Sequence, residues 1–125
     1  MTTKTIKQVS EQLNMSAATI RYYDKLGLLP NLKRDKNGYR QFSEKDIHTL
    51  KMIQCFRATG MSIEDLIKIF SQDASDPIVS LEMRQKIISK QREKLLKQRK
   101  RIDDALAMVD YKLKRYAELQ KQHRP

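Results

Sequence analysis

The sequence predicts a mostly α-helical protein in which a small N-terminal domain of short helices and one extended hairpin precedes a single long helix. Three observations predict this architecture. Helix-capping residues and glycines recur at short intervals up to about residue 71, Asn37-Gly38 interrupts the helical pattern, and residues 78–122 contain neither glycine nor proline. The predicted boundaries are 1–72 for the N-terminal domain, 73–77 for a linker, 78–122 for the long helix and 123–125 for a tail.

The first two predicted helices are short and joined by a tight turn. Ile6, Val9 and Leu13 recur at the spacing of one helix face. Ser16 is placed to cap a second helix, and Gly27 stands where a residue with left-handed backbone geometry would end it. Two short helices connected in this way form a helix-turn-helix.

The segment after Gly27 predicts an extended hairpin rather than a helix. Pro30 prevents helix continuation, and Asn37-Gly38 is the dipeptide that most favours a two-residue hairpin turn. A β-ribbon that follows a helix-turn-helix is a wing. The N-terminal domain is therefore predicted to be a winged helix-turn-helix.

Two more capped helices are predicted to complete this domain. Ser43 and Ser62 are each followed by an aspartate three residues later, which resembles a capping box with Asp in place of the usual Glu or Gln. The first of these helices is predicted to end at Gly60 and the second near Phe70.

The long C-terminal helix needs a partner, because a helix of roughly 65–70 Å is not stable as an isolated surface element. Apolar residues recur along it at every seventh position, whereas the companion column is polar in its centre. This polar centre disfavours a simple parallel zipper, so we expect a homodimer held by an antiparallel coiled coil. The residues predicted to form the dimer contact are Leu81, Ile88, Leu95, Ile102, Leu106, Val109, Leu113 and Tyr116.

Composition narrows the class of protein. The formal net charge of +11 implies an anionic partner. No apolar run approaches the roughly 20 residues that span a bilayer, so a cytoplasmic protein without a membrane partner is expected.

Cys55 is the one cysteine, which excludes an internal disulfide and a multi-thiolate metal site within one chain. With no glycine-rich phosphate loop and no nucleophile paired with a base, the chain is predicted to be no enzyme and to need no cofactor.

The residues that predict function lie on the second helix and on the hairpin. A helix that reads the major groove needs short or hydrogen-bonding side chains at its start, and bases around a hairpin tip suit the DNA backbone or minor groove. A basic surface that serves solubility alone is the alternative. Arginines combined with tyrosines at both places favour binding to double-stranded DNA. The predicted DNA contacts are Ser16, Ala18, Thr19, Arg21, Tyr22, Lys25, Lys33, Arg34, Tyr39 and Arg40.

The run TIRYYDKLGLLPNLKRDKNGYRQFSEKDI resembles the signature of the MerR family of bacterial transcription regulators. The resemblance continues through GMSIEDLIKIF into the long helix and covers essentially the whole chain. It implies a homodimer with an antiparallel helix pair, bound to a palindromic operator inside a promoter with an overlong spacer. It also implies activation by bending and untwisting the DNA, so that RNA polymerase is engaged indirectly and the cost of DNA deformation is the switch.

One segment of the sequence bears on the inducing signal. The segment MIQCFRATGMSIE resembles the family subgroup associated with aldehyde and thiol-reactive stress, in which a lone cysteine occupies this helix. Cys55 is predicted to lie off the core face, on the side of Lys51, whose charge favours the reactive thiolate. A small buried hydrophobic residue is the alternative, and both interpretations stay open. Metal-sensing members carry cysteines near the end of the long helix, where this chain offers His123, so no metal site is expected.

A second function class competes with the regulator. A coiled-coil interaction protein could bind nucleic acid or an acidic protein through the basic run between Arg84 and Arg101. We favour a solvated outer face of the dimerisation helix as the explanation of this run. Deleting residues 1–71 separates the two classes, because a helix-only fragment keeps nucleic-acid binding only if the run itself is the binding surface.

Overall fold

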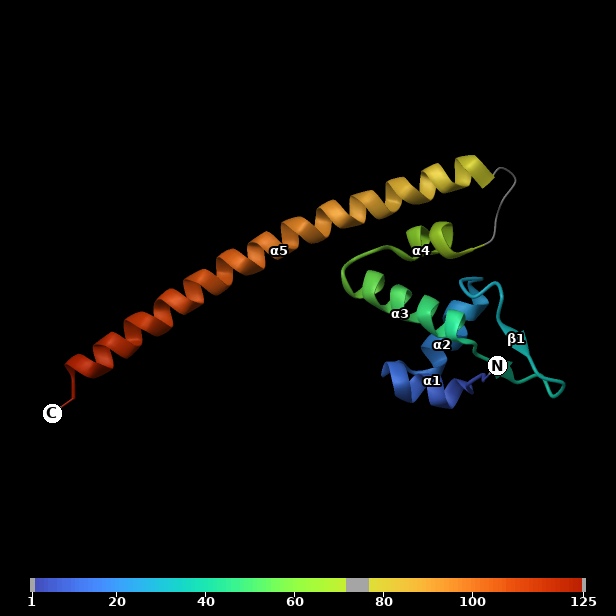
Figure 1. The fold of residues 1–125 in the computed structure, drawn as a ribbon, viewed down its shortest axis with the longest axis horizontal. Coiled ribbons are helices and arrows are strands. Elements are labelled where there is room, and N and C mark those ends of the chain that lie inside the picture. The colour runs from blue at the N-terminus through green and yellow to red at the C-terminus, as the bar shows by residue number, and fades with distance from the viewer. Residues whose placement is uncertain (1, 72–76, 125) are drawn as a thin grey trace. The chain divides into compact units, whose positions relative to one another are not determined.

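The computed structural model describes residues 2–71 and 77–124, with side chains of the last helix described from residue 80. The predicted linker at 73–77 and the boundary at 72 fall largely on residues outside this part of the chain. The elements are α1 (Ile6–Leu13), α2 (Ala17–Lys25), β1 (Lys33–Arg34), β2 (Arg40–Gln41), α3 (Glu44–Ala58), α4 (Ile63–Phe70) and α5 (Pro77–Gln122) (Figure 1). The predicted mostly α fold class is therefore confirmed. The chain divides into two compact units, Met1–Ile87 and Ile88–Pro125.

Side-chain caps fix the starts of the first four helices. The hydroxyls of Ser16, Ser43 and Ser62 each accept a hydrogen bond from the backbone N–H three residues later, as predicted. The carboxylate of Asp46 accepts in return from the backbone N–H of Ser43 at 2.9 Å, which completes a capping box. Thr5 begins α1 with a capping box that the sequence analysis missed. Caps of this kind stabilise a helix by about 1 kcal/mol each.

The turn between α1 and α2 requires one residue with left-handed backbone geometry. Asn14 takes this conformation with φ of 52°, and its backbone N–H bonds to the carbonyl oxygen of Ser10. Asparagine tolerates positive φ better than most side chains do. Gly27, with φ of 83°, ends the segment after α2 as predicted. These two positions set the helix-turn-helix geometry.

The wing is an antiparallel hairpin whose base joins the N-terminus. Its Cα partners are Lys33 with Gln41 and Arg34 with Arg40. Beyond β2, Phe42 and Lys4 exchange both backbone hydrogen bonds at 2.9 Å, which adds the residues before α1 to the ribbon. In Figure 1 the hairpin extends beyond the helices of the N-terminal unit.

The turn of the hairpin differs from the prediction. A two-residue turn at Asn37-Gly38 is wrong, because the last backbone-bonded pair is Asp35 with Tyr39 and three residues lie between them. Gly38 takes a φ of 85° while Asn37 does not enter the left-handed region. One carboxylate oxygen of Asp35 accepts from the backbone N–H of Asn37 and of Tyr39, both at 2.9 Å. This local side-chain bonding stabilises the longer loop.

One cluster of buried side chains forms the core of the N-terminal unit. It comprises Val9, Leu13, Met15, Ile20, Tyr23, Leu28, Leu29, Phe42, Ile47, Leu50, Ile53, Met61 and Leu66. Ile20 and Tyr23 of α2 face inward, and Leu26 on the same side is half-buried. Ile87 packs against the cluster, so the first turns of α5 belong to this unit.

The second unit is the remainder of α5, a continuous helix to Gln122 as predicted. The apolar side chains that were predicted to form the dimer contact are more than half exposed over the second half of the helix. Ile102, Leu106, Val109, Leu113 and Tyr116 are between 53% and 62% exposed. Among the described residues, no helix is both long enough and apolar enough to span a membrane.

Candidate nucleic-acid interface

The outer face of α2 carries the short and polar side chains predicted from the sequence. Exposed side chains of this face are Ser16, Ala18, Arg21, Tyr22 and Lys25, and Thr19 is half-buried. The hydroxyls of Ser16 and Thr19 lie 2.7 Å apart at the start of the helix. The rings of Tyr22 and Tyr23 are tilted against each other with centroids 5.9 Å apart. Because Tyr23 is in the core, this contact limits the directions that the Tyr22 ring can take.

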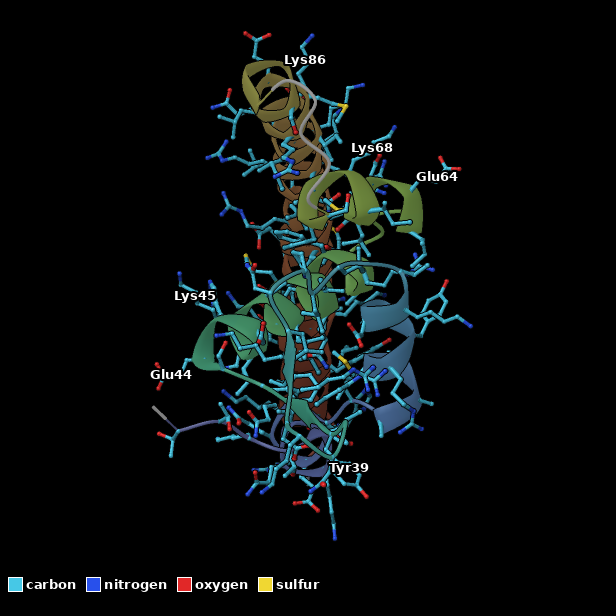
Figure 2. All side chains as sticks on the ribbon, turned by 90° about the vertical axis from the view of Figure 1, so that its right-hand side faces the viewer. Tyr39, Glu44, Lys45, Glu64, Lys68 and Lys86 are labelled. Atoms are coloured by element: carbon cyan, nitrogen blue, oxygen red, sulfur yellow. The ribbon has the colours of Figure 1, made fainter. Side chains whose placement is uncertain are left out.

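The wing presents a second group of predicted residues. Lys33, Arg34 and Tyr39 are exposed, whereas Arg40 is half-buried. Tyr39 is 71% exposed and follows the loop of the hairpin, where Figure 2 labels it. A large aromatic side chain in this position is available to a partner rather than to the core.

An aspartate on α2 connects the helix to the wing. Oδ2 of Asp24 accepts a hydrogen bond from Nε of Arg40 at 2.7 Å and lies 3.8 Å from Nη2 of Arg34. The side chains of Asp24 and Arg40 are 19% and 20% exposed, so this ion pair is shielded from most of the solvent. Arg40 was predicted to contact DNA, and the structure places it against Asp24. Asp24 itself was missed, although it is the one acidic residue of α2.

A groove runs between the wing, the residues before α1, and α2. It is lined by Thr3, Lys4, Thr5, Ile6, Arg21, Asp35, Gly38, Tyr39, Arg40 and Gln41. The groove brings Arg21 of α2 together with Tyr39 and Arg40 of the wing, which the sequence analysis had treated as two separate basic surfaces. Lys4 and Thr5 were missed, because their place here depends on the backbone bridge to Phe42 rather than on any local pattern. Hydroxyls and cationic side chains in one groove suit a phosphate backbone.

Cys55 is exposed on α3, as its predicted position off the core face requires. Its neighbour Ile53 is fully buried. The interpretation of Cys55 as a small buried hydrophobic residue is therefore wrong. Its backbone carbonyl accepts a hydrogen bond from the hydroxyl of Thr59 at 2.9 Å, near the end of the helix.

Comparison with known proteins identifies the family to which this N-terminal unit belongs. Residues 4–73, more than half of the chain, match the model of the MerR HTH family regulatory proteins. The chain belongs to the MerR family. The match spans α1 to α4 and includes both the α2 face and the wing, so the resemblance noted in the sequence is confirmed.

Relatives extend the MerR likeness over nearly the whole length of the chain. The chain is 37% identical over 114 residues to an HTH-type transcriptional regulator of Haemophilus influenzae, covering 91% of this chain and 84% of that protein. It is 38% identical over 91 residues to the regulator AdhR of Bacillus subtilis, covering 73% and 64%. The crystal structure of HiNmlR, a MerR family regulator lacking the sensor domain and bound to promoter DNA, superposes with a TM-score of 0.75 at 33% identity, covering 95% and 94%.

MerR membership makes this chain a DNA-binding transcription regulator with a winged helix-turn-helix. Its relatives are transcriptional regulators rather than enzymes. The rival interpretation, a basic coiled coil without a DNA-reading domain, is not favoured, because the matched family region is the N-terminal unit and not α5.

Proposed function

We propose that this MerR-family protein binds a promoter operator with α2 in the major groove and the wing against the DNA backbone. The observation that carries the proposal is the groove in which Lys4, Arg21, Tyr39 and Arg40 converge beside the exposed face of α2. Two cationic surfaces on one small unit can contact successive phosphates while short side chains at the start of α2 approach the bases. The structure of HiNmlR bound to promoter DNA supports the binding of promoter DNA by this chain.

The proposed assembly is a homodimer joined along α5. Ile102, Leu106, Val109 and Leu113 alternate at steps of four, three and four, which places them on one helix face, and all are exposed. Burial of this column against a second copy in antiparallel orientation removes it from water. Two N-terminal units related by a two-fold axis then match a palindromic operator.

Activation is proposed to act through the DNA. A dimer that bends and untwists an overlong promoter spacer presents both promoter elements to RNA polymerase, so the polymerase is engaged indirectly. The energy of DNA deformation then depends on the state of the protein. This mechanism operates in the cytoplasm and uses no cofactor.

In vitro selection from a library of random duplexes tests the proposed function. The full-length protein is expected to enrich an inverted repeat whose half-sites lie about one or two helical turns apart. Measured by fluorescence anisotropy at 150 mM salt, the enriched duplex should bind at least about a thousandfold more tightly than random duplex. Equal affinity for both duplexes would contradict operator recognition.

Tyr22→Ala is expected to weaken binding to the enriched duplex by about tenfold, within the range of one lost specific contact. The ring of Tyr22 is exposed beside Arg21 on the outer face of α2. Tyr111→Ala on α5 is the matched control, because it removes an exposed tyrosine outside the N-terminal unit. Sedimentation should show the same oligomeric state for both variants. Wild-type affinity in Tyr22→Ala would count against the docking of α2.

We also propose that Cys55 senses aldehydes or other electrophiles. The support is its exposure on α3 together with its place in a segment that resembles the thiol-stress subgroup. Its thiolate can add to an aldehyde carbonyl carbon, and the oxygen then takes a proton to give a hemithioacetal.

Cys55→Ala is expected to keep full operator affinity and to lose induction by an added aldehyde. Transcription from the enriched operator, measured with and without the aldehyde, checks this. Cys55→Ser is a near-isosteric control that should also lose induction. If Cys55→Ala induces as the wild type does, the cysteine has no sensing role.

A further inference from the structure

We propose that Asp24 is a positioning residue for DNA recognition, which holds the wing in a fixed orientation relative to α2. It acts through the arginines of the wing and need not touch DNA itself. This inference rests on the proposed binding of DNA by α2 and the wing.

The geometry joins one carboxylate to both strands of the hairpin. Oδ2 of Asp24 accepts from Nε of Arg40 in β2 at 2.7 Å and lies 3.8 Å from Nη2 of Arg34 in β1. Arg34 and Arg40 are directly opposite each other in the register of the ribbon. Nη1 of Arg34 also donates to the carbonyl oxygen of Gly38 at 2.9 Å, which links the same network to the loop.

The wing needs such a link because its own packing is slight. Residues 33–41, all of them described, include no buried side chain. Apolar anchors stand only at the base, where Phe42 is fully buried and Leu32 is half-buried. A two-stranded ribbon with strands of two residues has little stability of its own. The shielded ion pair between Asp24 and Arg40 therefore restrains the part of the wing that packing leaves free.

The negative charge of Asp24 by itself is unfavourable for binding DNA. The half-buried carboxylate of Asp24, next to Lys25 in the sequence and one helical turn from Arg21, repels the phosphates that these cations attract. If charge alone mattered, removing it would strengthen binding to any duplex. If positioning matters, removing it weakens binding to the recognised operator, because a mobile wing must be ordered on binding. The two roles predict opposite changes in DNA affinity, so a substitution of Asp24 distinguishes between them.

The test measures Asp24→Ala against two duplexes, the one enriched by the wild-type protein and a random duplex of equal length. We expect about a tenfold loss of affinity for the enriched duplex and no loss for the random duplex. Glu64→Ala is the matched control, since it removes an equal charge from an exposed position on α4 (Figure 2) and should change neither affinity by more than about twofold. Asp24→Glu keeps the charge and is expected to recover part of the discrimination.

A double-mutant cycle with Arg40→Gln completes the test. If Asp24 acts through Arg40, the double variant should bind the enriched duplex no more weakly than Arg40→Gln alone. In the DNA-free protein, ¹⁵N relaxation should show greater motion of the amides of residues 33–41 in Asp24→Ala.

The outcomes separate this inference from the proposed function. A wild-type protein that enriches no duplex overturns the proposed function and the inference with it. If the wild type does discriminate, the inference is overturned by undiminished discrimination in Asp24→Ala, by an equal loss on both duplexes, by additive losses in the cycle, or by unchanged wing motion.

Discussion

Leu106→Arg is expected to convert the protein to a monomer and to lower its affinity for a palindromic operator by at least about a hundredfold. Leu106 lies in the apolar column of α5 with Ile102 and Val109 and is 54% exposed. An arginine there would place an unpaired charge in the centre of the proposed dimer contact, which is strongly unfavourable. Without a linked partner the second half-site is lost, and linkage of two sites raises affinity by roughly 10²–10⁴.

Sedimentation equilibrium checks the oligomeric state, and an anisotropy titration with the enriched duplex checks the affinity. Met108→Arg is the matched control, since Met108 is 66% exposed, apolar, and two residues away, about 200° around the helix from Leu106. It should remain dimeric and bind as the wild type does. A dimeric Leu106→Arg variant would show that the column is not the dimer contact.

Phe42→Ala is expected to destabilise the N-terminal unit by about 3–5 kcal/mol, a large share of the stability of a small domain. Phe42 is among the largest fully buried side chains, and its backbone bridges Lys4 at the base of the wing. The substitution leaves a cavity where wing, N-terminus and helices meet. Thermal unfolding followed by circular dichroism should show a fall in Tm of more than about 10 °C.

Tyr39→Ala is the matched control, because Tyr39 is also an aromatic residue and follows the same hairpin loop. Tyr39 is exposed, so its removal should change the free energy of unfolding by no more than about 0.5 kcal/mol while weakening operator binding. The pair of variants thus separates an aromatic residue needed for the fold from one available to DNA. Equal stability of Phe42→Ala and Tyr39→Ala would show that Phe42 does not stabilise the core.

Helix boundaries were predictable because the interactions that set them are local. Ser43 and Asp46 are three residues apart and are joined by hydrogen bonds between their own backbone and side-chain groups, so the capping box can be predicted from the sequence. The turn of the wing was not predictable in the same way. Asn37-Gly38 favours a two-residue turn, but the carboxylate of Asp35 accepts from two backbone N–H groups and stabilises a longer loop.

The residues of the candidate site also comprise some that were predictable from the sequence and some that were not. Arg21, Tyr22 and Tyr39 were predictable as surface residues, because a helix face and a hairpin tip are defined by periodicity and turn residues. Lys4 and Asp24 were not predictable. Lys4 reaches the groove through a bridge to Phe42, thirty-eight positions later, and Asp24 meets Arg40 sixteen positions along the chain.

The sequence by itself therefore determined the helices, the caps of α2, α3 and α4, the presence of a wing, the cationic character of the outer α2 face and membership of the MerR family. Those features depend on residues within one or two helical turns of each other, whose interactions repeat in any fold. Only the tertiary structure decided which charged side chains form ion pairs with each other. An ion pair such as Asp24 with Arg40 forms when the hairpin folds back onto α2, and the distance between two side chains in space is not encoded in their separation along the chain.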